Sequence, residues 1–73
     1  MIGPINVSDS TKLSRYILNG GEPLVNTAIE CMRKSEAEDQ FLLGKAEGLI
    51  LAIAHESGAS ADFVRDHVCD ESF

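Results

Sequence analysis

Residues 35–58, SEAEDQFLLGKAEGLILAIAHESG, decide the fold because they form the longest and most apolar helical stretch that the sequence allows. Ser35 followed by Glu38 is a capping-box pattern, which marks a helix start. Gly58 fits the end, since a glycine after the last turn readily adopts the left-handed conformation. We therefore predict a central helix over residues 36–57.

The apolar residues of this central helix are too many for one face. Spacings of three and four predict a face turned to the core, made of Leu42, Ala46, Leu49, Ile50 and Ile53. Phe41, Leu43, Leu51 and Ala54 fall partly outside that face. A helix that is apolar nearly all round is usually surrounded by protein, and a chain of 73 residues is short for that. The pattern therefore indicates a partner.

Three small residues, Gly44, Gly48 and Ala52, repeat every four positions along one side of the central helix. A glycine inside a helix costs about 1 kcal/mol relative to alanine, so this row indicates the close approach of another helix. The sequence leaves open whether that helix belongs to the same chain or to a partner. A membrane span is not expected, because the apolar run over residues 41–54 is shorter than the ~20 residues that a span needs.

The rest of the sequence predicts shorter helices packed around the central one. Ser8, Asp9 or Ser10 can cap the first of these helices, and Ser60 can cap the last. With apolar stripes and glycine or proline boundaries, these caps place the helices at residues 8–19, 22–34 and 60–70. Asn19-Gly20-Gly21 is a strong stop between the first two. The predicted fold is a single small all-α domain over residues 1–73, with three to four short helices around one long central helix.

Residues 1–7, MIGPINV, have no helical period and predict an extended N-terminal arm. Either the arm lies on a neighbouring subunit or on the domain's own groove, or it is a frayed start partly tucked onto the core. If the chain associates with copies of itself or with a larger assembly, we expect the interface to contain Phe41, Gly44, Gly48, Leu51, Ala52, Ile2 and Ile5.

The charge balance is acidic, with 12 Asp and Glu against 6 Lys and Arg. It disfavours direct binding to nucleic acid, which depends on the neutralisation of phosphates. An alternative function is that of an acidic inhibitor or nucleic-acid mimic, which docks on a basic groove of a larger protein. Its interface would consist of Asp62, Asp66, Asp70 and Glu71. The same net charge is also ordinary for a protein surface.

No motif predicts catalysis, a cofactor or a metal site. The spacing of His67 and Cys69 does not place both on one helical face, and no nucleophile is set beside a base and an orienting group. We therefore expect a protein that is not an enzyme. The N-terminus lacks a signal-peptide pattern, which predicts a cytoplasmic, reducing compartment with Cys31 and Cys69 as free thiols.

Two short stretches resemble known families. Ala54, Gly58, Ala59, Ser60 and Val64 match the helix-turn-helix signature, which implies a tight corner and, as a third function, a DNA-binding regulator. The acidic residues of its second helix would repel phosphate. Residues 40–49, QFLLGKAEGL, resemble the long helix of small helical proteins of tailed phages, although Leu43 stands where a basic residue is expected. That resemblance implies a structural or assembly role in a virion.

Overall fold

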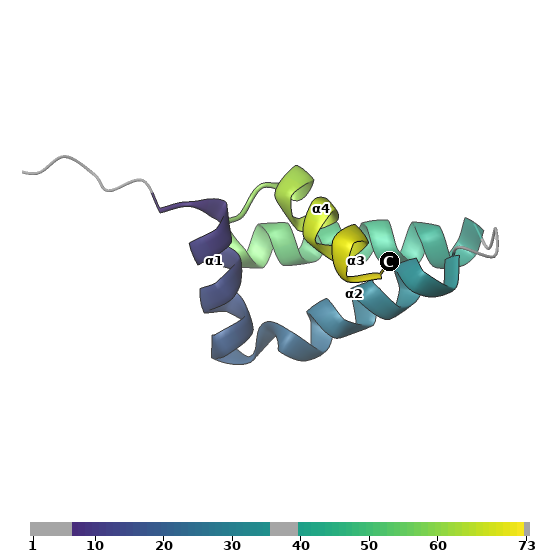
Figure 1. Ribbon diagram of the computed structural model, residues 1–73, viewed down its shortest axis with the longest axis horizontal. Coiled ribbons are helices and arrows are strands. Elements are labelled where there is room, and N and C mark those ends of the chain that lie inside the picture. The colour runs from purple at the N-terminus through teal and green to yellow at the C-terminus, as the bar shows by residue number, and fades with distance from the viewer. Residues whose placement is uncertain (1–6, 36–39, 73) are drawn as a thin grey trace, which may run out of the picture.

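The computed structural model describes residues 7–35 and 40–72, and these residues form helices and no strand. In chain order the elements are α1 (Asp9–Tyr16), the π-helical segment η1 (Ile17–Gly21), α2 (Glu22–Ser35), α3 (Gln40–Ser57) and α4 (Ala61–Ser72), shown in Figure 1. The prediction of an all-α fold is confirmed. The central helix was predicted to begin at residue 36, and residues 36–39, like the arm residues Ile2 and Ile5, lie outside the described part of the chain.

A kink joins α1, η1 and α2 into one helical stretch of 27 residues. At the kink Asn19 has φ −92° and ψ 18°, and Gly20 has φ 106°, a left-handed conformation that favours glycine. The sequence predicted two separate helices, 8–19 and 22–34, with a stop between them. That boundary is a bend instead, because only these two residues leave the helical conformation before α2 continues. The kinked stretch is also longer than α3, which was predicted to be the longest helix.

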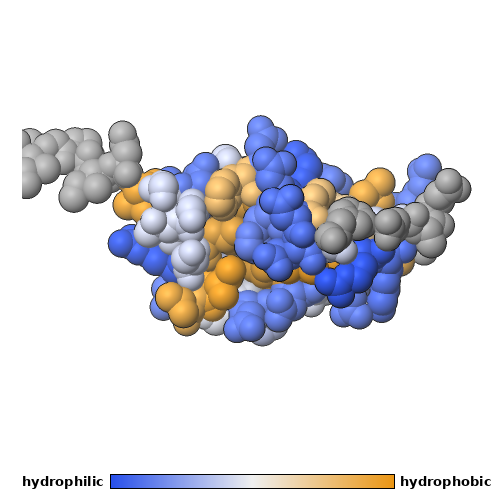
Figure 2. Space-filling view, in the orientation of Figure 1, coloured by the Kyte–Doolittle hydropathy of each residue, from blue (hydrophilic) through white to orange (hydrophobic). Residues whose placement is uncertain are grey.

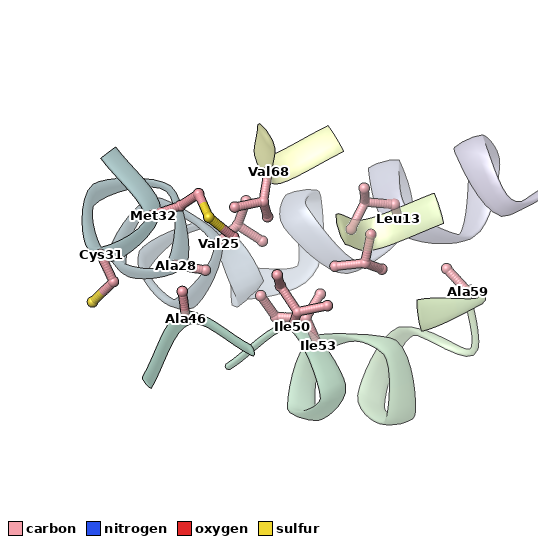
Figure 3. Close-up of a cluster of buried hydrophobic side chains, with 11 residues drawn as sticks. Leu13, Val25, Ala28, Cys31, Met32, Ala46, Ile50, Ile53, Ala59 and Val68 are labelled. Atoms are coloured by element: carbon pink, nitrogen blue, oxygen red, sulfur yellow. The ribbon is translucent and has the colours of Figure 1, made fainter. Parts of the chain in front are cut away.

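α2 and α3 lie antiparallel and form the most extensive contact between helices (Figure 1). Ala28 of α2 and Ala46 of α3 are both fully buried and lie close together in the core (Figure 3). These two alanines are part of the packing between α2 and α3, whereas Gly44, Gly48 and Ala52 are exposed on α3.

The core is the face of α3 that the sequence predicted. Ala46, Ile50 and Ile53, which we call the inner face of α3, are each 0% exposed. The other helices cover it with Leu13 of α1, Val25, Ala28, Cys31 and Met32 of α2, and Val64 and Val68 of α4. Leu42 and Leu49 are partly buried against this cluster, as their spacing predicted.

The C-terminal end of α4 is held against α2. Arg33 Nε donates to the Ser72 carbonyl at 3.3 Å, and its Nη2 donates to the Glu71 carbonyl at 3.2 Å. The Ser72 hydroxyl is buried, 2.6 Å from the Val68 carbonyl oxygen and 3.0 Å from that of Ile29. The sequence predicted that this helix ends at residue 70. The helix continues to Ser72, where Arg33 binds the carbonyls that the helix end leaves without partners.

Serine caps and a glycine set the helix boundaries. Ser8 Oγ accepts from the Thr11 amide, and Ser60 Oγ accepts from the Phe63 amide, so two of the expected caps are confirmed. Gly58 has φ 81° at the corner between α3 and α4, as the helix-turn-helix resemblance implied. Ser35 instead ends α2, where its hydroxyl donates to the Met32 carbonyl at 2.6 Å. Glu38, its expected partner in a capping box, is not described.

Gly21 allows the Tyr16 ring to pack on the backbone at the kink. A Cβ at residue 21 would overlap atoms of that ring. We predict that Gly21→Ala lowers the free energy of unfolding by about 1–3 kcal/mol, although alanine is the better helix former. Urea unfolding monitored by circular dichroism measures this. An unchanged or raised stability would show that the Tyr16 ring moves aside freely and is not held tightly against the backbone of Gly21.

Candidate functional site

One side of α3 is not covered by any helix formed by residues 7–35 and 40–72. Five residues make up this surface, which we call the outer face of α3: Phe41, Gly44, Gly48, Leu51 and Ala52. All five are exposed, whereas the inner face on the opposite side is fully buried. The structure thus brings together the five interface residues that the sequence predicted on this helix. Ile2 and Ile5, predicted for the same interface, lie outside the described residues.

The two glycines of the outer face have open space above them. A Cβ built at Gly44 or Gly48 would meet no neighbouring atom within 4 Å among the described residues. The sequence left open whether this row lets helices cross within the chain or receives a partner. Within the described part of the chain no helix packs on the glycines. Their cost of about 1 kcal/mol each in a helix interior is therefore not offset by packing there.

Two large apolar side chains lie on the same side of α3 as these glycines, with Phe41 78% exposed and Leu51 57%. Leu43 is 43% exposed but lies on another side of the helix, about 100° around the axis from Gly44. Residues 41, 44, 48, 51 and 55 follow one another at spacings of three and four, which is the repeat that lines the seam between two packed helices. α3 is therefore apolar on both sides, with one side in the core and the other presenting a small-residue seam between larger apolar groups.

Charged groups lie along both edges of the outer face. Lys45 is exposed on one edge. On the other edge Glu47 is held by Arg65 of α4, whose Nη2 lies 2.8 Å from Oε2 and whose Nε donates to both carboxylate oxygens. This pairing, with a smaller contribution from Asp62, raises the pKa of the Arg65 guanidinium. The link between α3 and α4 was not predicted, because the two residues are 18 positions apart in different helices.

A shallow polar groove lies beside the C-terminal end of α3, where α1 crosses it. Its lining residues are Lys12, Arg15, Tyr16, Asn19, Glu56 and Ser57, and its volume is about 310 Å³. Small-molecule sites of this size are usually enclosed and mostly apolar. This groove is open and lined by polar and charged residues, so it does not argue for a buried small ligand.

Tyr16 ties α1 to α3 across this groove. Burial raises the pKa of its hydroxyl above the ordinary value of 10.0, and the negative charge of Glu56 and a hydrogen bond to that carboxylate raise it further. The neutral phenol is thus the form that the folded chain stabilises.

The acidic residues of the alternative interface lie on α4. Asp62, Asp66, Asp70 and Glu71 are all exposed, and Asp62 is paired with Arg65 at 3.2 Å. Figure 2 shows the hydrophilic surface over α4, and hydrophobic atoms at the corner where α1 turns into α2. In a helix-turn-helix protein α4 would be the helix that enters the major groove of DNA. Its exposed acidic side chains would repel the DNA phosphates.

Other kinds of site find little support. No group of three or more metal-binding side chains comes together in residues 7–35 and 40–72. Cys31 is buried, Cys69 is partly buried, and both are free thiols. None of the described helices is long and apolar enough to cross a membrane.

Neither a protein-family model, a curated protein nor a solved structure matches the chain. The function must therefore be argued from the surfaces described above.

We predict that Gly44→Ala and Gly48→Ala each raise the free energy of unfolding of the monomer by about 0.5–1 kcal/mol. The new methyl groups enter open space, so only the better helix propensity of alanine counts. Thermal unfolding of dilute samples measures this, and about 1 kcal/mol corresponds to roughly 4–8 °C in Tm for a domain of this size. A fall in Tm would mean that the glycines are packed within the chain.

We also predict that Tyr16 makes the stability depend on pH at the alkaline end. Its pKa is higher in the folded chain than in the unfolded chain, where it is near 10.0. The contribution is therefore complete below that pH and is lost as the pH rises through the folded value. The test is the difference in unfolding free energy between the wild type and Tyr16→Phe as the pH is raised. A difference that stays constant above pH 10.0 would contradict the assignment.

Proposed function

We propose that this chain is a non-enzymatic assembly subunit that associates with further copies of itself through the outer face of α3. One observation carries the proposal: Gly44 and Gly48 lie under open space between the exposed side chains of Phe41 and Leu51. A helix that keeps two unpacked glycines and two large apolar groups on one solvent-facing side is suited to receive another helix.

The size of the chain supports the same proposal. A domain of this length buries only roughly 60% of the surface of its unfolded chain, so its core alone gives a small net stability. Disulfides and metals are the other usual sources of extra stability, and in the described residues both thiols are free and no metal-binding group forms. Association with another chain adds stability by mass action.

The setting that we favour is the assembly of a larger protein structure, such as a virion. It rests on the resemblance of residues 40–49 to the long helix of small tailed-phage proteins. In the structure these residues hold Phe41, Gly44 and Gly48, which are three of the five residues in the outer face of α3.

The second candidate function is acidic docking on a basic groove of a larger protein. The observation that favours it is the exposed row Asp62, Asp66 and Asp70, spaced four residues apart along α4. A complex of this kind should weaken steeply with added salt and with Asp62→Asn and Asp66→Asn. An apolar contact through α3 should respond little to either change.

We predict that the wild type is oligomeric at micromolar concentration and that Leu51→Lys dissociates it, with a dissociation constant raised about 30-fold or more. A charge at residue 51 would have to be buried against the partner. Leu18→Lys is the matched control, because Leu18 is 84% exposed and belongs to η1, not to the outer face of α3. Native mass spectrometry and light scattering of the three proteins measure this.

Gly48→Leu provides a second test at the same surface, since a large side chain there would fill the space meant for the partner. It should dissociate the oligomer while leaving the helical content unchanged. A wild type that is a clean monomer at micromolar concentration would refute self-association. Dissociation by Leu18→Lys but not by Leu51→Lys would show that the chain associates through another surface and would refute the role of the outer face of α3.

A further inference from the structure

We infer that the partner of the outer face of α3 is a second copy of this chain in antiparallel orientation, with Leu51 of each copy over Gly48 of the other. This inference rests on the proposed function and specifies its orientation and register. A twofold axis perpendicular to α3 generates such a pair, and twofold dimers are the commonest closed assemblies.

The sizes of the side chains on the outer face favour the antiparallel arrangement. In a parallel pair in register, Leu51 would meet the partner's Leu51 and Gly48 would meet the partner's Gly48. The leucines would hold the helices apart, and the glycines would face each other across a gap that forfeits packing contacts. In the antiparallel pair each Leu51 enters the open space above the partner's Gly48, so that a large group always meets a small one.

The same register brings opposite charges together. When Leu51 is level with the partner's Gly48, His55 is level with the partner's Gly44. The helices run in opposite directions, so a step of four residues forward along one helix corresponds to four residues back along the other. Lys45 then lies within about 3 Å, measured along the helix axis, of the level of the partner's Glu56. Lys45 and Glu56 are 11 positions apart, or about three turns, so they share one edge of α3.

Disulfide trapping tests the orientation directly. In a background with Cys31→Ala and Cys69→Ser, the variants Gly44→Cys and His55→Cys are oxidised separately and as an equimolar mixture. A disulfide needs Cα atoms within about 7 Å. The antiparallel register makes the mixed pair level, whereas like residues are about 16 Å apart along the axis. We therefore expect roughly tenfold more covalent dimer from the mixture than from either variant alone.

A charge exchange tests the register with both native cysteines kept. Lys45→Glu alone and Glu56→Lys alone each place like charges opposite one another in the homodimer. Their equimolar mixture restores both opposite-charge pairs, so the mixed dimer should exceed the statistical proportion roughly fivefold in native mass spectrometry at low salt.

The outcomes separate the inference from the proposed function. Covalent dimers from each cysteine variant alone, with little from the mixture, would show a parallel pair and overturn the inference while self-association stands. A statistical proportion of mixed dimer in the charge exchange would overturn the register. A monomer throughout, with no covalent dimer in any sample, would overturn both.

Discussion

The fold depends on the burial of one face of α3. Ala46, Ile50 and Ile53 are completely removed from solvent, and α1, α2 and α4 each contribute side chains that cover them. Burial of a large aliphatic side chain contributes about 1.5–3 kcal/mol, more than the ion pairs on the surface of this chain can supply. The kink at Gly20, the corner at Gly58 and the contact of Arg33 with the end of α4 serve to bring the other helices onto this face.

The two sides of α3 carry different residues, and only the inner side is buried by the helices described. The inner face packs against α2 through the fully buried Ala46 and contains no glycine. The glycines are on the other side, together with Phe41 and Leu51. In the described part of the chain the other helices cover only the inner side of α3. In our account the outer face is covered by a second chain, which makes α3 a core shared between two copies.

Periodicity in the sequence predicted the inner and outer faces of α3 well. Ala46, Ile50 and Ile53 are buried, and Phe41, Leu43 and Leu51 are exposed, because a regular helix fixes which residues share a side. The starts of α1 and α4 were also predictable, because the caps Ser8 and Ser60 form hydrogen bonds with residues only three positions away. The kink was mistaken for a stop, since a glycine in the left-handed conformation ends one helix whether or not another begins at once. Contacts between distant residues, such as Arg33 with Ser72 and Arg65 with Glu47, depend on how helices pack and have no local signal.

Urea unfolding of the wild type over about a hundredfold range of chain concentration tests directly whether a second copy covers the outer face of α3. If the outer face of α3 is buried in a second copy, folding and association are linked, and the unfolding midpoint rises with concentration by mass action. The rise should be present at high salt as well, because the contact is mainly apolar. A midpoint that is the same at all concentrations would contradict the account and leave the inner face as the whole core of this protein.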